Sequence, residues 1–461
     1  MQTTANMGEN NLDAVLDQAP WSVLARFLVA FTAFTLIIDG FDNQALGFAA
    51  PLIIGEWGLT RADLAPVVAL GTIGTALGAA IAGYLGDRFG RKNALLASVM
   101  LFGVATAFTT QAHDLTTLAV LRFFAGAGIG GALPNASALA AEFTPPRFRP
   151  TAVVLTIVCV PLGGMVGGLV AAEVLPLFGW RTLFLIGGLA PLLAAGVLAF
   201  GFPESPHFLA LRQERRPELD RLLARLGLNT AKLVVATYTE KRSIKLAELV
   251  GPVYRHDTLA LWGAFFCSLF AVYGMFNWAP TVLAGQGLNL PDASRATATY
   301  NFGGVLGAIT CALVIHRLGS RLLMTGFAVL AALSAVILAS IPVTTGPLLW
   351  PLWLALASHG FLVNGVQTSL YALAAYVYGA ETRSSGSGAA LSVGRIGAIA
   401  SSYAAVPIAV VGAKGFYLAL AVAMIGAAMA LVLVRRHIPI RSRLVASKEG
   451  ATNTASDFIS R

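Results

Sequence analysis

Charged residues are scarce in this chain: they make up 11% of its 461 residues, whereas 57% are hydrophobic. An average soluble domain contains about 25% charged residues. A soluble fold could not bury this much apolar surface, so the composition predicts an all-α membrane protein with many spans. The formal net charge of +9 does not indicate a nucleic-acid partner, because the basic residues lie in loops between apolar runs.

Signatures of catalysis and metal binding are also missing. The chain contains three cysteines, all inside apolar runs and without metal-ligand spacing: Cys159, Cys267 and Cys311. We therefore expect neither a metal nor another cofactor. No nucleophile–base pair and no phosphate-binding loop stands out, so the sequence does not indicate an enzyme. Acidic rather than basic residues precede the first apolar run, so we expect no cleaved signal peptide.

Long apolar runs, by contrast, are abundant. A membrane-spanning helix needs about 20 residues. Twelve runs of about that length occur, at 24–54, 62–85, 93–112, 115–141, 151–175, 180–202, 259–285, 296–316, 322–342, 349–378, 386–411 and 414–434. We expect the domains to be an N-terminal tail (1–23), a six-helix bundle (24–202), a charged central loop (203–258), a second six-helix bundle (259–434) and a C-terminal tail (435–461). A short amphipathic surface helix is predicted within the central loop, at Glu218–Leu226.

Basic residues predict the orientation of these spans. With both termini and the central loop on one side, that side holds 25 of the 31 Lys and Arg residues. The opposite side holds Arg61, Arg181, Arg295 and Lys414, and two more arginines lie inside spans. Because cytoplasmic loops carry the excess of Lys and Arg, we expect both termini and the central loop to be cytoplasmic.

The two halves of the chain share a short loop. Gly83–Lys92 (GYLGDRFGRK) joins the second and third spans, and His316–Arg321 (HRLGSR) joins the eighth and ninth. Parallel six-span repeats are a transporter architecture with a substrate cavity between the repeats. We expect glycines to permit a tight turn in the first loop and its charged residues to form a gate: Gly86, Asp87, Arg88, Gly90 and Arg91. The alternative is a loop that serves topology alone.

Two acids, Asp39 and Asp42, lie in the middle of the first span and share one helix face. A carboxylate at membrane depth is costly and marks a candidate site. Arg122 in the fourth span cannot lose its charge and needs an anionic partner, for which the two acids are candidates. This group predicts proton coupling; a static structural ion pair is the alternative. Glu142, at the end of the fourth span, is interpreted as a gate or structural pair more than as a further proton carrier.

Arg395 lies about ten residues into the eleventh span and is our candidate for binding a substrate carboxylate. A snorkelling or interhelical arginine is the alternative. Arg383, near the cytoplasmic end, suits gating at least as well as binding. Other polar and aromatic residues at similar depth are candidate substrate contacts, each about equally suited to bonding between helices: Phe41, Asn277, Trp278, Tyr300, Asn301, Asn364, Gln367 and Tyr371.

The loop Gly83–Lys92 resembles that of the major facilitator superfamily, and the resemblance covers the whole chain. Four further stretches are similar to the bacterial aromatic acid:proton symporters: Asp39–Asp42, Leu133–Ala136, Pro203–Leu209 and Gly394–Ala398. The resemblance implies alternating access between two six-helix bundles. It also implies that the acids Asp39, Asp42 and Asp87 and the arginines Arg383 and Arg395 are functional. His316 stands where the family usually has an acid, which puts a symmetric gate in doubt.

The resemblance thus implies proton-coupled uptake of a small aromatic carboxylate such as 4-hydroxybenzoate, protocatechuate or benzoate. The expected partners are that substrate, the proton and the lipid bilayer, and the expected location is the bacterial inner membrane. A monomer is the default for this fold. Two alternatives stay open: a proton symporter of another organic anion or a sugar, and a non-transporting membrane sensor of aromatic acids.

Overall fold

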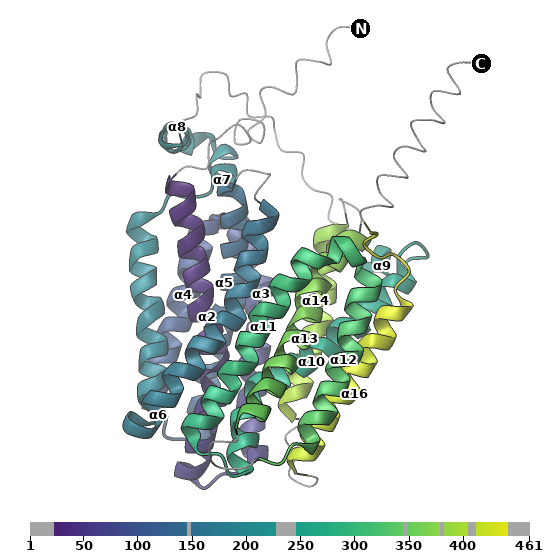
Figure 1. Cartoon of the computed structure of the whole chain (residues 1–461). Coiled ribbons are helices and arrows are strands. Elements are labelled where there is room, and N and C mark those ends of the chain that lie inside the picture. Colours follow the sequence, from purple (N-terminus) through teal and green to yellow (C-terminus); the bar gives the residue numbers. More distant parts are fainter. Residues whose placement is uncertain are drawn as a thin grey trace, which may run out of the picture. The chain divides into compact units, whose positions relative to one another are not determined.

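The computed structural model describes residues 23–144, 149–226, 246–343, 349–378, 382–403 and 412–440. The expectation of an all-helical membrane protein is confirmed for this part of the chain (Figure 1), in which nine helices are long and apolar enough to cross a membrane. The chain divides into two compact units. Unit 1 contains residues 1–241, 276–284 and 288–298, and unit 2 contains residues 242–275, 285–287 and 299–461.

Unit 1 contains the first six predicted spans. They correspond to α2 (Val23–Trp57), α3 (Arg61–Phe89), α4 (Arg91–Phe108), α5 (Leu115–Phe143) and α6 (Arg149–Gly201), with the one-turn helix η1 (Thr109–Gln111) after α4. The helix α6 holds both the fifth and the sixth span. Gly179, with φ 74°, breaks it between them, because this backbone conformation is open to glycine at little cost.

Side-chain caps set two of the helix starts in unit 1. At the start of α3, the Thr60 amide donates to Asp63 Oδ2 at 2.8 Å and the Asp63 amide donates to the Thr60 hydroxyl at 3.3 Å. At the start of α5, Asp114 accepts a hydrogen bond from the Thr117 amide at 2.8 Å. Each cap accepts hydrogen bonds from amides that the first helical turn leaves without partners. The caps therefore fix the residues at which these two helices begin.

Unit 2 is built from the remaining spans: α10 (Arg255–Gly285), α11 (Leu290–Leu318), α12 (Ser320–Ser340), α13 (Trp350–Val377), α14 (Arg383–Tyr403) and α16 (Ala413–Leu433). Residues 276–284 of α10 and residues 288–298, which include the start of α11, belong to unit 1. The predicted eleventh span continues to residue 411, and its last part lies outside the described residues. Neither α13 nor α14 is one of the nine helices that are long and apolar enough by composition, and both contain polar residues along their length.

The central loop contains short helices: α7 (Pro206–Ala210), η3 (Gln213–Arg215), α8 (Arg216–Arg225) and α9 (Leu246–Leu249). The predicted amphipathic helix is confirmed as α8, which begins two residues earlier than expected. Its leucines Leu219, Leu222 and Leu223 are buried in the hydrophobic core of unit 1. Figure 1 shows α7 and α8 at the end of unit 1 where α2 begins.

The repeated loop is a one-residue turn in both units. Gly90, with φ 105°, separates α3 from α4, and Gly319, with φ 75°, separates α11 from α12. Both values lie in the region that favours glycine. Gly86, which was also expected in the turn, lies inside α3 instead. There a Cβ atom would overlap the Asn135 side chain, so this glycine serves close packing.

Candidate functional site

The two acids of the first span are buried in unit 1. Asp39 is 4% exposed and Asp42 is 1% exposed, both on α2. Arg122 on α5 is 5% exposed, and its Nη1 lies 3.4 Å from Asp42 Oδ2. The structure thus brings together the predicted arginine and the second of the two predicted acids. Within the described residues, no group donates a hydrogen bond to Asp42 Oδ1.

The guanidinium of Arg122 has further partners that the sequence did not indicate. Its Nη2 donates to the hydroxyl of Thr106 at 2.9 Å and to that of Thr109 at 3.2 Å. The ring of Phe184 on α6 lies 4.8 Å from the guanidinium carbon and supplies a cation–π contact. A pair of hydroxyls three residues apart at the end of a span was the only available signal, and it is a weak one.

The ion pair of Asp42 and Arg122 is not built for maximal strength. Charge-assisted N–H···O bonds are usually about 2.7–2.9 Å long, and arginine often binds a carboxylate through two such bonds. Here one contact of 3.4 Å joins the side chains. Removing two charges from water costs several kcal/mol per ion, which only excellent geometry repays. The pair therefore suits a change of protonation better than it suits stability.

Glu142 lies away from this pair. It is near the end of α5 and close to the first copy of the repeated loop. Its Oε1 is 3.9 Å from Arg91 Nε, and its Oε2 is 3.8 Å from His207 Nδ1. The hydroxyl of Ser205 also donates to Glu142. These contacts favour the interpretation of Glu142 as part of a gate or structural cluster.

The predicted gating residues surround the same turn. Arg91 pairs with Asp87, which is exposed, and the exposed Arg88 donates to the Tyr84 hydroxyl at 2.7 Å. Glu204, in the stretch after the sixth span, accepts from the Lys92 amide at 2.8 Å. A carboxylate at the start of α4 interacts favourably with the helix dipole. A Cβ atom on Gly90 would overlap this carboxylate, so the turn leaves room for glycine alone.

In unit 2, Arg395 on α14 is half-buried and donates to the Tyr273 hydroxyl at 3.4 Å. Tyr371 on α13 lies close enough for the charge of Arg395 to act on its hydroxyl, and the ring of Phe265 contacts the Tyr371 ring with 5.7 Å between centroids. Gln367, one helical turn before Tyr371, is 7% exposed. Its side-chain amide lies within reach of the Tyr371 hydroxyl.

This group has the chemistry of an anion site. No carboxylate of the described residues pairs with Arg395. An arginine inside a span needs an anionic partner or access to water. A guanidinium, an amide, two tyrosine hydroxyls and an aromatic ring together suit a small aromatic anion.

The remaining predicted contacts are distributed over both units. Tyr300 and Asn301 on α11 are fully buried in unit 2, where the Tyr300 ring lies 5.9 Å from the His359 ring. Asn364 donates to the Gly360 carbonyl at 3.1 Å. Phe41, Asn277 and Trp278 belong to unit 1 and are buried, and Arg383 is exposed. Their predicted roles stay predictions.

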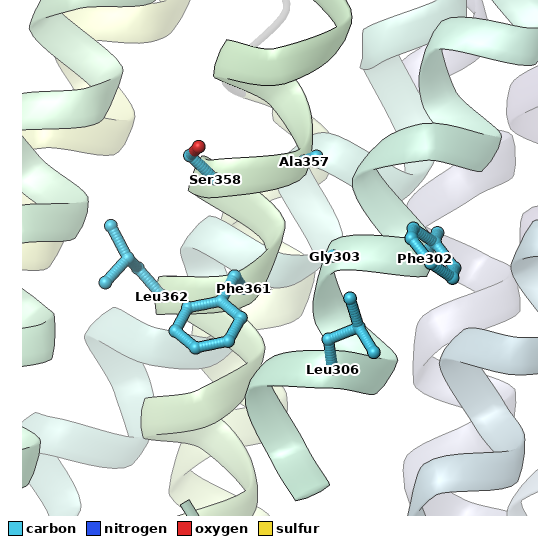
Figure 2. Close-up of a pocket in the computed structure, with 7 residues that line it drawn as sticks. All are labelled: Phe302, Gly303, Leu306, Ala357, Ser358, Phe361 and Leu362. Atoms are coloured by element: carbon cyan, nitrogen blue, oxygen red, sulfur yellow. The ribbon is translucent and has the colours of Figure 1, made fainter. Parts of the chain in front are cut away.

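A separate cavity of about 310 Å³ in unit 2 does not overlap this site (Figure 2). It is lined by residues of α11 and α13: Phe302, Gly303, Leu306, Ala357, Ser358, Phe361 and Leu362. None of these residues is charged, and only Ser358 carries a polar side chain. The cavity therefore offers nothing that would neutralise a carboxylate. The described residues contain no cluster of three or more metal-binding side chains.

Comparisons with known proteins agree with these features. The family model of the Major Facilitator Superfamily matches residues 32–402. The chain is 34% identical to a 4-hydroxybenzoate transporter of Pseudomonas aeruginosa, over 83% of this chain and 84% of that protein. It is also 34% identical to a gallate transporter of Pseudomonas putida, over 85% of this chain and 88% of that protein.

The fold has solved counterparts. The inward open conformation of the xylose transporter XylE from E. coli matches with a TM-score of 0.71 and 17% sequence identity, over 90% of this chain and 97% of that one. At this identity the match shows the fold alone. The resemblance to aromatic acid transporters that the motifs indicated is confirmed by the curated relatives. The chain therefore belongs to the Major Facilitator Superfamily and is a multi-pass membrane transporter rather than an enzyme.

Proposed function

We propose that this transporter imports a small aromatic carboxylate together with protons. The observation that carries the proposal is Arg395: a half-buried arginine inside a membrane helix with no carboxylate partner among the described residues. The curated relatives transport 4-hydroxybenzoate and gallate, and each of these is an aromatic carboxylate. The carboxylate of the substrate supplies the missing anion, and the aromatic ring of the substrate packs with Tyr371 and Phe265.

The arrangement favours an anion over a sugar. A neutral sugar would leave the charge of Arg395 uncompensated at membrane depth, which is costly. A carboxylate accepts two parallel hydrogen bonds from a guanidinium, which fixes the orientation of the ring. Gln367 then pairs with a ring substituent such as a hydroxyl, because its amide can both donate and accept.

Protons load at the acids of unit 1. Asp42 and Arg122 are joined by one long contact, and Asp39 lies one helical turn away on the same face of α2. Protonation of Asp42 removes its attraction to Arg122 and so favours a different packing of α2 against α5. Entry of one proton with one monovalent anion is electroneutral, so the pH gradient is the driving force for that stoichiometry.

The repeated loop serves as the cytoplasmic gate in this proposal. In the structure Asp87 pairs with Arg91, and Glu142 lies near both Arg91 and His207. These bonds hold the cytoplasmic ends of α3, α4 and α5 in one arrangement, and transport breaks and remakes them. Both termini lie in the cytoplasm, and the protein is a monomer of the bacterial inner membrane.

Uptake of radiolabelled 4-hydroxybenzoate into proteoliposomes tests the proposal. We expect uptake to rise with an inward proton gradient and to be reduced by competing benzoates but not by xylose. Arg395→Lys should lower the apparent affinity for the acid. The matched control is Arg225→Lys, since Arg225 is exposed in the last turn of the surface helix α8. Uptake that ignores the gradient, or competition by xylose alone, would overturn the proposal.

A further inference from the structure

The Thr106 and Thr109 hydroxyls both accept hydrogen bonds from one nitrogen of the Arg122 guanidinium, Nη2. Both threonines are fully buried in unit 1, at 0% exposure. Arg122 Nη2 donates to them at 2.9 and 3.2 Å, whereas Nη1 lies 3.4 Å from Asp42 Oδ2. The shorter contacts of this arginine are thus to neutral groups and the longer one is to its counter-ion.

This division is unusual for an arginine beside a carboxylate. The guanidinium fork matches a carboxylate through two parallel bonds, and a charged acceptor forms the stronger bond. In the absence of competing hydroxyls, we would expect Arg122 to donate hydrogen bonds to Asp42 from both terminal nitrogens. Asp42 Oδ1, which accepts no hydrogen bond from the described residues, is available for that second bond.

Thr106 differs from other buried threonines of unit 1 in the use of its hydroxyl. Thr72 donates to the Val68 carbonyl at 3.1 Å, one turn earlier in its own helix. Thr109 likewise donates to the Ala105 carbonyl at 2.9 Å and accepts from Arg122. The Thr106 hydroxyl instead interacts with both members of the ion pair, Arg122 and the Asp42 carboxyl.

Among the residues that the structure describes, few other groups act on this pair. The α6 helix contributes the ring of Phe184, which carries no proton to exchange. The α4 helix and the η1 turn contribute the two threonines. The other buried carboxylate of α2 is Asp39. The position of the guanidinium is therefore set by a balance between two hydroxyls, the Phe184 ring and the Asp42 carboxylate.

We propose that Thr106 and Thr109 are positioning residues that hold Arg122 partly away from Asp42 and thereby set the pH at which the transporter loads its proton. The proposal rests on the proton-coupled function proposed above. A weakened ion pair lets a proton displace the arginine at a lower proton concentration. A fully formed bidentate pair would require a higher proton concentration for the same exchange.

The pH dependence of uptake tests this role. Thr109→Val removes a competitor for Arg122 without removing a group that interacts with Asp42, and valine has the same shape. We expect the pH of half-maximal uptake to fall by about one unit, a tenfold change in proton concentration equivalent to about 1.4 kcal/mol. Thr106→Val should shift it less, because it also removes a hydroxyl that stabilises the Asp42 carboxylate.

Two control variants separate positioning from structure. Thr109→Ser keeps the hydroxyl and should keep the wild-type midpoint. Thr72→Val removes a buried hydroxyl that bonds only within α3 and should also keep it. A Thr109→Val protein with a lower rate at every pH and an unchanged midpoint would overturn the inference, and so would a shift to higher pH. Wild-type uptake that does not depend on pH would instead contradict the proposed function itself.

Discussion

Replacing Asp42 by asparagine should destabilise the protein more than replacing both Asp42 and its arginine partner. Asp42→Asn leaves the buried charge of Arg122 without a counter-ion, and arginine cannot neutralise itself by losing a proton. Breaking a buried pair by removing one partner typically costs about 3–5 kcal/mol. Thr106, Thr109 and Phe184 still contact the guanidinium, so we expect a loss near the lower limit, about 3 kcal/mol.

The double variant Asp42→Asn with Arg122→Met should recover most of this loss. Methionine fills much of the volume of the arginine side chain and carries no charge, and replacing a whole buried pair by apolar groups is often neutral. We expect it to lie within about 1 kcal/mol of wild type, so that the second substitution recovers about 2 kcal/mol of the loss. The assay is chemical unfolding in detergent micelles followed by tryptophan fluorescence.

The comparison has a clear opposite outcome. If adding Arg122→Met to Asp42→Asn lowers the stability further instead of restoring it, the two side chains do not interact in the folded protein. The geometry on which the proposed proton site depends would then be refuted. Asp220→Asn is a suitable control, because Asp220 forms an exposed surface pair with Arg216 at 3.5 Å and such pairs contribute little.

Three further predictions follow from other parts of the structure. Gly90→Ala should lower the free energy of unfolding by at least about 1–3 kcal/mol, because the alanine strains the backbone and overlaps a carboxylate. The control Gly58→Ala has open space around it and should show the backbone strain alone. Burial lowers the pKa of His437 below its ordinary value of 6.5, so its neutral form is the one that folding favours. Its contribution to stability should be complete above that pH and be lost as the pH falls, and His437→Gln should remove this dependence in unfolding curves. Arg395→Lys should leave the unfolding free energy nearly unchanged while it weakens equilibrium binding of the aromatic acid at least about tenfold, because lysine lacks the bidentate fork.

The spans and the repeated turn could be predicted from the sequence because their signals are local. An apolar run of about 20 residues has few alternatives to a spanning helix. Gly90 and Gly319 occur at equivalent points of two similar loops, and both adopt the positive φ that glycine permits. The kink at Gly179 also lies in the predicted gap between the fifth and sixth spans.

The partners within the candidate site could be predicted only in part. Burial of the two acids could be predicted from the cost of charge at membrane depth. Which of them pairs with Arg122 could not, because the pairing depends on how far α2 is shifted along its axis relative to α5. Thr106 and Thr109 could not be identified, since a threonine in a helix usually bonds to its own backbone. The grouping of Glu142 with Ser205 and His207 joins residues more than 60 positions apart, beyond any local pattern.

Proton entry during substrate uptake tests the central proposal most directly. Proteoliposomes that contain a pH-sensitive dye are given external 4-hydroxybenzoate without an imposed gradient, and protein-free liposomes report passive entry of the acid. The account predicts internal acidification in excess of that passive background, and loss of this excess with Asp42→Asn. Protein-dependent accumulation of the labelled acid with no acidification beyond the background would contradict it.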